Sequence, residues 1–536
     1  MFNETTYPQL LAAVTQAHGR RTFLEAASAL QGQRVTLTYA TFERQSRRVA
    51  AGLLALGLRR GDRMAIAAPN QIEWLELFFG AARIGVIVVT LNVRYRESEL
   101  DYMLNQSGAR LVVSAAHSGG FDFEHFYAGF HARIPTVERV LFLGASNPHD
   151  SYATLLTHPV DDQLTLEEQK VGPDDPAVIL YTSGTTGRPK GAVLTHCSLI
   201  ASGRAQVLNY GSTEEDVYMG LMPLNHVGGI TCTITAALLA GSAVILEDAF
   251  SPGRALEVLN EHGVTTFGGV PTMWKLMLAH ESIARVNKET LRFPIIGGAN
   301  VEPALARQIV DTFPNARLTN LYGLSESSGA AVISPVTDSL EAVARSIGLP
   351  LAGVEARVVD ADGTALPPGQ EGELQLRGSG VAAGYWQMPK ETTETFLPGG
   401  WLATGDMVSQ EPDGHLLLRG RRKEMFIQGG YNVYPVEIEN VLAAHPAVAM
   451  AAGIGIPDAV LGEVGCYYVT LRPGKASTEA ELIDHCGAKL ADYKVPRRIV
   501  FTPELPLTPS GKIAKAELRE RITPTSLIGR RPVQGT

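Results

Sequence analysis

The feature that most constrains the fold is an alternation of strand and helix patterns in the first 90 residues. Apolar side chains at three- and four-residue spacing predict one face of a helix that begins after Thr38 and runs to about residue 56. A buried strand is indicated at residues 64–67, a second helix at about 72–84 and a second strand at 86–90. Strand, helix and strand in this order predict a parallel sheet with both faces covered, and so an α/β fold.

The alternation returns further along the chain, and the pattern then changes twice. Apolar strands are indicated at residues 177–180, 243–246 and 294–296. From about Arg345, short alternating strands separated by Asp-Gly and Pro-Gly turns are typical of a small antiparallel or barrel-like unit. Past Gly420 the pattern becomes mixed α+β, with helices expected at 436–444 and near 478–490, and a disordered tail from Thr523.

We therefore predict two domains. Residues 1–420 are expected to form a large α/β domain of stacked, helix-covered sheets plus a small β-barrel-like unit. Residues 421–536 are expected to form a small α+β domain. A chain of 536 residues is long enough to bury several cores.

Composition excludes several classes of function. The chain is 45% hydrophobic and 19% charged, which is typical of a soluble globular protein. A net charge of −9 disfavours a nucleic-acid binder, although a local basic site for a phosphorylated ligand is compatible with it. The four cysteines form no CxxC pair, and the start of the chain lacks a basic-then-apolar signal pattern, so we expect a protein of the reducing cytoplasm.

One uncharged stretch, Val227 to Leu246, is long enough to span a bilayer. It contains several glycines and threonines, and Gly241-Ser242 indicates a break between a helix and a strand. A buried helix followed by a core strand is the better interpretation, so we expect no integral membrane association.

The strongest functional signal is the segment Tyr181-Thr-Ser-Gly-Thr-Thr-Gly-Arg-Pro-Lys-Gly191, which directly follows an apolar strand. Its glycines let backbone N–H groups point inward, and its hydroxyls and cations converge on the same space, which suits a polyphosphate. No Gly-Lys-Ser/Thr ends the segment, so a P-loop NTPase is disfavoured. The candidate phosphate-binding residues are Thr182, Ser183, Gly184, Thr185, Thr186, Gly187 and Lys190.

This segment resembles the signature loop of the adenylate-forming superfamily, which includes acyl-CoA synthetases, firefly-type luciferases and peptide-synthetase adenylation domains. The resemblance extends over nearly the whole chain, because the family's other motifs follow in their expected order. It implies a C-terminal domain that is mobile and turns about a hinge.

Nucleotide-binding roles follow from this resemblance for several further motifs. Asn320-Leu-Tyr-Gly-Leu-Ser-Glu326 resembles the segment whose tyrosine, here Tyr322, stacks on adenine and whose glutamate, here Glu326, helps hold Mg²⁺. Asp406, in Trp401-Leu-Ala-Thr-Gly-Asp406, matches the residue that binds the ribose hydroxyls. The remaining ATP-binding positions implied in this way are Gly298, Ala299, Asn320, Gly323 and Ser325, with Ser325 standing where threonine is usual.

Two C-terminal motifs complete the resemblance. In Gly420-Arg421-Arg-Lys423, the arginine that contacts ATP maps to Arg421 and the hinge maps to Lys423. Gly429 and Gly430 match the glycines that pass the pantetheine arm of coenzyme A. Leu505-Pro-Leu-Thr-Pro-Ser-Gly-Lys512 resembles the catalytic-lysine motif, so Lys512 is expected between the substrate carboxylate and the α-phosphate.

The acid-binding pocket is the least constrained part. Met222-Pro-Leu-Asn-His226 matches the segment with a histidine at the acyl pocket, where His226 is a candidate catalytic residue. Amino-acid substrates are disfavoured, because an aspartate usual in peptide-synthetase domains is missing here. Without an arginine in this pocket a second substrate carboxylate would lack a partner, which favours a monocarboxylic acid. The expected pocket residues are Val227, Gly228, Gly229, Val270 and Ala330.

The resemblance therefore implies an ATP-dependent acyl-CoA synthetase. It would join a carboxylic acid to coenzyme A through an acyl-adenylate, with ATP and Mg²⁺ as cofactors and AMP and pyrophosphate as products. A medium- or long-chain fatty acid and an alicyclic or aromatic acid both remain open as substrates.

Alternatives from other classes also remain open. They are an acyl-AMP ligase that loads a carrier protein, a luciferase-like oxygenase and a non-catalytic nucleotide-binding relative. A homodimer is a further expectation. Acetylation of Lys512 by a lysine acetyltransferase is another, because Pro506 to Lys512 resembles a context in which related synthetases are switched off.

Overall fold

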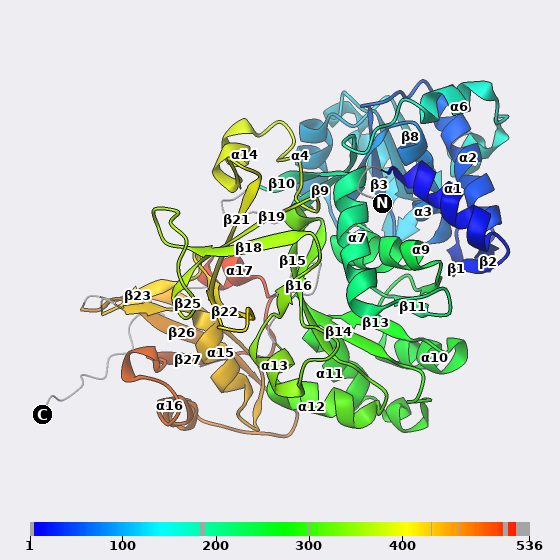
Figure 1. Ribbon diagram of the computed structural model, residues 1–536. Helices are drawn as coiled ribbons and strands as arrows, with labels where there is room; N and C mark the ends of the chain where they lie inside the picture. The colour runs from blue at the N-terminus through cyan, green and yellow to red at the C-terminus, as the bar shows by residue number, and fades with distance from the viewer. Residues whose placement is uncertain are drawn as a thin grey trace, which may run out of the picture. The chain divides into compact units, whose positions relative to one another are not determined.

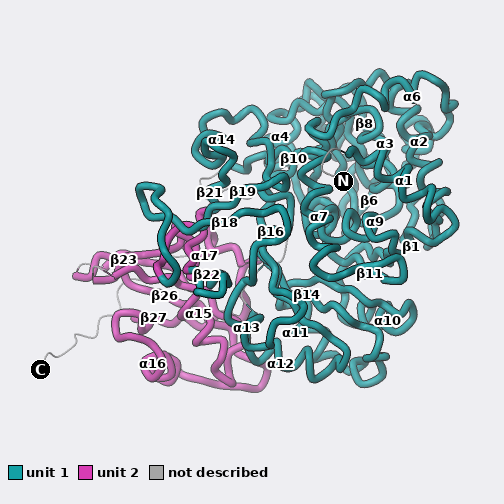
Figure 2. Tube along the Cα trace, viewed as in Figure 1, with its two compact units in different colours: residues 1–369, 374–404, 410–417 teal, residues 370–373, 405–409, 418–536 magenta. Residues whose placement is uncertain are grey.

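The computed structural model describes residues 5–182, 188–298, 301–429, 431–458, 460–507 and 513–520. The chain forms two compact units (Figure 2). The N-terminal unit comprises residues 1–369, 374–404 and 410–417, and the C-terminal unit comprises residues 370–373, 405–409 and 418–536. The expected boundary at residue 421 thus lies close to the point where the chain finally enters the C-terminal unit, which also takes in two earlier strand segments.

The N-terminal unit is built on a sheet of nine strands in the order β17-β16-β15-β14-β13-β11-β12-β1-β2. The six central neighbours from β15 to β1 pair in parallel, while β16, β17 and β2 add antiparallel edges. Its strands are β1 (Thr22–Ser28), β2 (Gln33–Thr38), β11 (Val217–Gly220), β12 (Ala243–Leu246), β13 (Thr266–Gly269), β14 (Phe293–Gly297), β15 (Thr319–Leu324), β16 (Gly329–Ile333) and β17 (Leu349–Pro350).

A second sheet has six strands in the order β10-β9-β4-β3-β5-β8. All neighbours are parallel except β9 and β10, which form an antiparallel pair around the predicted phosphate loop. Its strands are β3 (Arg63–Ala67), β4 (Ile87–Leu91), β5 (Leu111–Ala115), β8 (Arg139–Leu143), β9 (Pro176–Thr182) and β10 (Lys190–Thr195). The predicted parallel α/β architecture is confirmed.

The helices form where the periodicity predicts them. Helix α2 (Tyr39–Ala55) begins after Thr38, whose hydroxyl accepts a hydrogen bond from the Thr41 N–H at 3.2 Å and so caps the first turn. The other helices of the N-terminal unit are α1 (Tyr7–His18), α3 (Ile72–Arg83), α4 (Glu97–Ser107), α5 (Phe123–Phe130), α6 (Asp162–Glu168), α7 (His196–Tyr210), α8 (Val227–Gly229), α9 (Ala236–Ala240), α10 (Pro252–His262), α11 (Pro271–Ala279), α12 (Pro303–Thr312), α13 (Leu340–Arg345) and α14 (Pro389–Thr395).

Both sheets are buried on both faces. The largest core cluster combines strands of the two sheets with helices α1, α2 and α3, which lie together at the blue end of Figure 1. Helices α10, α11 and α12 cover the other face of the nine-stranded sheet, and α4 and α5 cover the other face of the six-stranded sheet. Burial on both faces explains why these strands read as continuous apolar runs in the sequence.

The uncharged stretch from Val227 forms helix α8, a π-helical segment (Ile230–Thr235) and helix α9, and then strand β12. Gly241 adopts a left-handed conformation with φ +72° between α9 and β12, which confirms the predicted break. Within the described part of the chain, every helix is too short or too polar to cross a membrane.

A third sheet has five strands and corresponds to the expected small β unit. Its order is β18-β19-β21-β20, with β22 paired to β21, and the unit boundaries fall within β19, β21 and β22. The strands are β18 (Val354–Val359), β19 (Glu371–Gly378), β20 (Phe396–Leu397), β21 (Trp401–Gln410) and β22 (Leu416–Arg421).

The C-terminal unit has its own five-stranded sheet and is α+β, as expected. Helices α15 (Pro435–Ala443) and α16 (Glu479–Gly487) pack on one face, and α17 (Lys515–Glu520) packs on the other. The strands are β23 (Phe426–Gln428), β24 (Tyr431–Val433), β25 (Val448–Asp458), β26 (Gly462–Leu471) and β27 (Arg498–Phe501). The residues from Thr523 onward, for which we expect a tail, lie outside the described ranges.

Candidate active site

Predicted site residues gather at one edge of the nine-stranded sheet. Strands β13, β14 and β15 are parallel neighbours in register, with Gly269 opposite Ile296 and Gly297 opposite Leu321. The residues that follow these positions, Val270, Gly298 and Tyr322, therefore lie at the carboxyl ends of adjacent strands. This is the edge at which open α/β sheets bind ligands.

Backbone geometry explains two glycines at this edge. Gly298 has φ +78°, in the region that favours glycine. A Cβ on Gly323 would lie 1.9 Å from the carbonyl oxygen of Gly329 on the paired strand β16, so only glycine fits there. Tyr322, directly before Gly323, is 8% exposed. Ser325 begins a short 3-10 turn that carries Glu326.

Asn320 lies two residues before Tyr322 on β15 and is buried. Its side-chain amide donates to the carbonyl oxygens of Ser346 at 2.8 Å and Val343 at 3.4 Å. These bonds tie β15 to the end of helix α13. We therefore expect Asn320 to act by fixing the strand that carries Tyr322.

The phosphate loop is described only at its two ends. Thr182 ends β9 and pairs with Lys190, which begins β10. The hydroxyl of Tyr181 donates to Gln106 Oε1 at 2.5 Å, and that of Tyr102 donates to the carbonyl oxygen of Pro189 at 3.0 Å. Both ends of the loop are therefore held by helix α4. Five predicted phosphate-binding residues, Ser183, Gly184, Thr185, Thr186 and Gly187, lie outside the described ranges.

A segment that sequence reasoning missed, residues 382–386, joins the two sheets. On one side its backbone pairs with β10. The Ala383 N–H donates to the Val193 carbonyl oxygen, and the Val193 N–H donates to the Gly384 carbonyl oxygen, both at 2.9 Å. At its start the Ala382 N–H donates to the carbonyl oxygen of Glu326 at 2.9 Å. We call it the 382–386 segment.

Tyr385 of this segment lies between two predicted ligand-binding groups. Its hydroxyl donates to Glu326 Oε1 at 2.7 Å, and Lys190 Nζ lies 4.9 Å from its ring centroid. Burial, together with the neighbouring Glu326 carboxylate, raises the pKa of Tyr385 above its usual value, so the hydroxyl keeps its proton and remains a donor. In the sequence, the only local indication that Tyr385 belongs to the site was the pair Gly384-Tyr385 before Trp386.

The donor set around Glu326 suits a cation that is held mainly by a nucleotide. Among the residues that the structure describes, no group of three histidine, cysteine or acidic side chains is placed to hold a metal ion. Mg²⁺ with a nucleotide usually takes one or two carboxylates plus phosphate oxygens and water, so a single carboxylate is a reasonable fit.

His226 caps the short helix α8. Its Nδ1 accepts a hydrogen bond from the Gly228 N–H at 3.0 Å, which fixes the ring at the start of the predicted acyl pocket. Val227 beside it is 5% exposed. A Cβ on Gly229 would lie 2.3 Å from the Pro223 carbonyl oxygen, so this glycine is required by close backbone packing whatever its role in binding.

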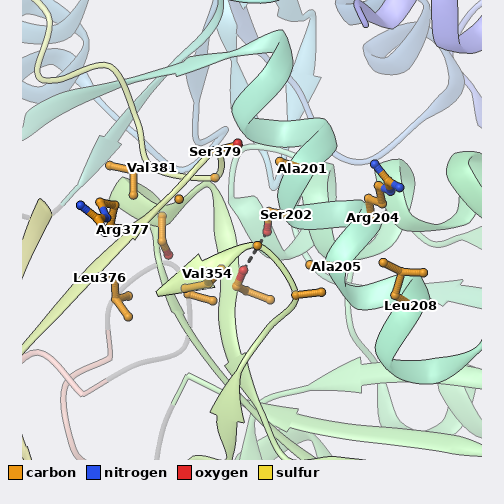
Figure 3. Close-up of a pocket in the computed structure, with 17 residues that line it drawn as sticks. Ala201, Ser202, Arg204, Ala205, Leu208, Val354, Leu376, Arg377, Ser379 and Val381 are labelled. Carbon is orange, nitrogen blue, oxygen red and sulfur yellow. Dashed lines mark hydrogen bonds between the residues drawn. The ribbon is translucent and has the colours of Figure 1, made fainter. Parts of the chain in front are cut away.

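A cavity of about 230 Å³ lies between helix α7 and the β18–β19 region of the N-terminal unit. In Figure 3, Arg204 and Leu208 extend from α7 at one side, and Leu376 and Arg377 lie opposite. Ala330 lines this cavity, and its carbonyl oxygen accepts a hydrogen bond from Ser202 Oγ at 3.0 Å. The other four predicted acyl-pocket residues, Val227, Gly228, Gly229 and Val270, are not part of its lining.

In the C-terminal unit, two predicted nucleotide contacts form an ion pair. Arg421 Nε lies 3.0 Å from Asp406 Oδ1, and the Asp406 side chain is 4% exposed. Next to them, Glu373 accepts hydrogen bonds from the Gly405 N–H at 3.0 Å and from Arg422 Nη1 at 2.9 Å. Lys423, the predicted hinge, is exposed within the turn that follows β22.

A partly buried ammonium group contacts Glu424, the residue that follows the predicted hinge. Lys515 Nζ, on helix α17, lies 2.7 Å from Glu424 Oε2 and 2.8 Å from Glu439 Oε1. The bridge between Leu507 and Ile513 closes the chain on either side of the predicted lysine loop. Gly429 has φ +60°. Lys512, Gly430 and Ala299 lie outside the described ranges.

Comparison with known proteins agrees with this arrangement. The model of the AMP-binding enzyme family matches residues 11–386, and that of the AMP-binding enzyme C-terminal domain matches residues 437–512. A feruloyl-CoA synthase of Amycolatopsis sp is 34% identical over 499 residues, which cover 92% of this chain and 96% of that one. The fatty acid–acyl-carrier-protein ligase ScoC of Streptomyces coeruleorubidus is 34% identical over 526 residues, which cover 96% and 97%.

The fold also matches solved structures over nearly its full length. The anthranilate CoA ligase AuaEII, solved in complex with anthranoyl-AMP, has a TM-score of 0.88 and 26% identity, and the match covers 98% of this chain and 99% of that one. The family model covers more than half of the chain and both curated relatives exceed 30% identity. The chain therefore belongs to the AMP-binding enzymes, in their acyl-CoA synthetase branch, and is an AMP-forming ligase.

Proposed function

We propose that this ligase activates a monocarboxylic acid with an apolar body as its acyl-adenylate and transfers the acyl group to coenzyme A in the cytoplasm. The observation that carries the proposal is the linked set Lys190, Tyr385 and Glu326, which brings a cation and a carboxylate together beside the ends of β9 and β15. A cation suits phosphate oxygens, and a carboxylate suits a metal ion bound to them.

In the first step, a carboxylate oxygen of the acid attacks the α-phosphorus of ATP. The new O–P bond forms as the bond to pyrophosphate breaks, so no protein nucleophile is required. Lys190 and the hydroxyls of the phosphate loop would bear negative charge on the phosphates, with Lys512 between the two reacting anions. When bound beside Glu326, Mg²⁺ would neutralise charge on the phosphate oxygens.

In the second step, the thiol of coenzyme A attacks the acyl carbonyl, loses its proton, and AMP leaves. Under this proposal the C-terminal unit turns about Lys423 between the steps, which withdraws Lys512 and brings Gly429 and Gly430 to the thiol. Asp406 would hold the ribose hydroxyls and Arg421 would contact the nucleotide. The ion pair of these two side chains supports the idea that they act at one place.

The class of acid rests on the predicted pocket. Its residues are small or apolar, and His226, directly before Val227, is held by its bond to Gly228. The relatives differ in the acids that their names give: ferulic and anthranilic acids are aromatic, whereas that of ScoC is a fatty acid. We propose a medium- or long-chain fatty acid first, and an aromatic or alicyclic acid second.

A panel of fatty, aromatic and alicyclic acids, assayed for AMP release with and without coenzyme A, tests the proposal. Release of AMP that requires both one of these acids and coenzyme A supports it. Acid-dependent pyrophosphate release that stalls with coenzyme A but proceeds with a phosphopantetheinylated carrier protein would favour a carrier-loading ligase, a second candidate suggested by the name of ScoC. Absence of acid-dependent pyrophosphate release across the panel would contradict both.

Two finer proposals need their own measurements. Light scattering during size-exclusion chromatography tests for a homodimer. Intact-mass analysis of protein from its native host, before and after deacetylase treatment, tests whether acetylation of Lys512 removes the charge that adenylation requires. Unmodified Lys512 across growth conditions would exclude this form of regulation.

A further inference from the structure

Tyr385 contacts two oppositely charged groups, Lys190 and Glu326, that do not pair with one another. We propose that it is a positioning residue for the phosphate and metal site: its ring holds Lys190, and its hydroxyl orients the Glu326 carboxylate. The inference rests on the proposed function, because it takes Lys190 and Glu326 as the groups that meet the phosphates and Mg²⁺.

The backbone around Tyr385 is fixed independently of its side chain. The 382–386 segment pairs with β10 on one side, and the Trp386 N–H donates to the Gly191 carbonyl oxygen at 2.8 Å. The Tyr385 N–H donates to Thr392 Oγ1 at 3.0 Å, in the middle of α14. Backbone hydrogen bonds on both sides of Tyr385 therefore hold this residue in place whatever its hydroxyl contacts.

The two contacts use different parts of the side chain. The Lys190 ammonium group, 4.9 Å from the ring centroid, is attracted by the electron-rich face. The hydroxyl donates to one oxygen of Glu326, which leaves the other oxygen of that carboxylate as a metal ligand. A direct ion pair would consume both charges, whereas here Lys190 lies against the Tyr385 ring and Glu326 accepts from its hydroxyl.

Simple packing would not require the hydroxyl. Phenylalanine would fill the same space against Phe396, whose ring centroid lies 5.4 Å away in an edge-to-face arrangement. Tyr385 is 8% exposed, so a hydroxyl placed there needs a partner, and Glu326 is the partner at 2.7 Å. Hydrogen bonds to a charged acceptor are stronger than those between neutral groups.

The test uses Mn²⁺ with α,β-methylene-ATP, which binds but cannot release pyrophosphate, so it needs no knowledge of the acid. Electron paramagnetic resonance gives the Mn²⁺ dissociation constant of the protein–nucleotide complex. For Tyr385→Phe we expect this constant to rise about tenfold, while affinity for the metal-free nucleotide changes less than twofold, since the ring still holds Lys190. For Tyr385→Leu we expect both affinities to fall.

Tyr39→Phe is the matched control, because it removes another buried tyrosine hydroxyl, bonded to the Ser242 carbonyl oxygen at 2.7 Å in the same unit. It should leave both constants unchanged. In a double-mutant cycle, Tyr385→Phe should add nothing to Glu326→Gln. An unchanged Mn²⁺ constant in Tyr385→Phe would overturn the inference alone. A wild-type protein that binds neither Mn²⁺ nor the nucleotide would overturn the proposed function with it.

Discussion

The charged side chains of the candidate site have different kinds of partner in the two units. In the N-terminal unit a neutral tyrosine separates the cation Lys190 from the carboxylate Glu326. In the C-terminal unit the charges are paired directly: Arg421 with Asp406 at 3.0 Å and Arg422 with Glu373 at 2.9 Å.

The difference bears on how each unit meets a ligand. Charged groups that contact a neutral side chain keep their capacity to bind phosphates and metal. They are also oriented before the ligand binds. Charges that pair with one another must exchange partners on binding. Arg421 and Arg422 are 44% and 55% exposed, so water can solvate both guanidinium groups when they leave their carboxylates. Such an arrangement suits the proposed role of this unit in two successive reactions.

The largest expected effect tests whether the C-terminal unit contributes chemistry at all. Lys512→Ala removes the cation proposed to lie between two reacting anions. Acid-dependent pyrophosphate release should fall about a hundredfold or more. Conversion of a supplied acyl-adenylate to the thioester should change less than threefold, because Lys512 is proposed to be withdrawn in that step. Equal loss of both half-reactions with an intact fold would contradict the alternation of the C-terminal unit.

The partly buried ammonium of Lys515 differs from the Arg421 and Arg422 side chains, because it is less exposed and contacts two carboxylates. It is 15% exposed and shared by Glu424 and Glu439, so Lys515→Met leaves two carboxylates near each other without their cation. We expect a loss of about 3 kcal/mol in the free energy of unfolding of this unit, measured by urea denaturation.

Lys494→Met is the matched control for that measurement. Lys494 also contacts a carboxylate, Glu437 at 2.7 Å, but this glutamate is 41% exposed and can be solvated. Its replacement should cost less than about 1 kcal/mol. Equal losses for the two variants would mean that burial of Lys515 is unimportant to the stability of the unit.

Much of the fold followed from local pattern. The cap at Thr38, the buried helix α3 and the strands on either side of it were predictable, because an apolar face repeats over a few residues whatever the rest of the chain does. Helix α16 was predicted to continue to residue 490 but ends at Gly487, since helix ends depend on capping contacts that periodicity does not contain.

The site was predictable only where residues lie together in one motif. Tyr385 was missed because its partner Glu326 is 59 residues away along the chain, and only the assembled 382–386 segment brings the two together. The glycines were ambiguous for a related reason. Gly229 was predicted to line the acyl pocket, yet its absent Cβ is explained by the Pro223 carbonyl oxygen, a contact that composition cannot reveal.

A smaller effect concerns the proposed hinge and would sharpen the contrast between a fixed and a turning unit. Proline at residue 423 fixes φ and resists a large backbone rotation. Lys423→Pro should lower one half-reaction about tenfold and spare the other, measured separately by pyrophosphate release and by thioester formation from supplied acyl-adenylate. Lys423→Ala, which removes the side chain but keeps the rotation, should leave both within twofold. Unchanged turnover in the proline variant would exclude Lys423 as the hinge.

The smallest effect extends the comparison to stability, because the N-terminal unit also buries an acid whose pKa is raised. Glu76 on α3 is 4% exposed, and burial raises its pKa to about 7, with Glu73 nearby adding to the shift and the Tyr152 hydroxyl, which donates to Glu76, opposing it. A carboxyl that binds its proton more tightly in the folded state stabilises the fold fully below about pH 4.5, and that contribution is lost as pH rises through about 7.

Glu76→Gln replaces this group with a neutral one of the same shape, so it should remove the pH dependence that Glu76 contributes. Relative to the wild type, the variant should gain about 1 kcal/mol in the free energy of unfolding between pH 6 and 7.5. His196 contributes with the opposite sign, because burial lowers its pKa to about 4 and its stabilisation is lost as pH falls. Its contribution cancels when variant and wild type are compared at each pH. A difference between the two proteins that does not change with pH would show that Glu76 is ionised in the fold, and that this unit, like the other, tolerates a buried charge.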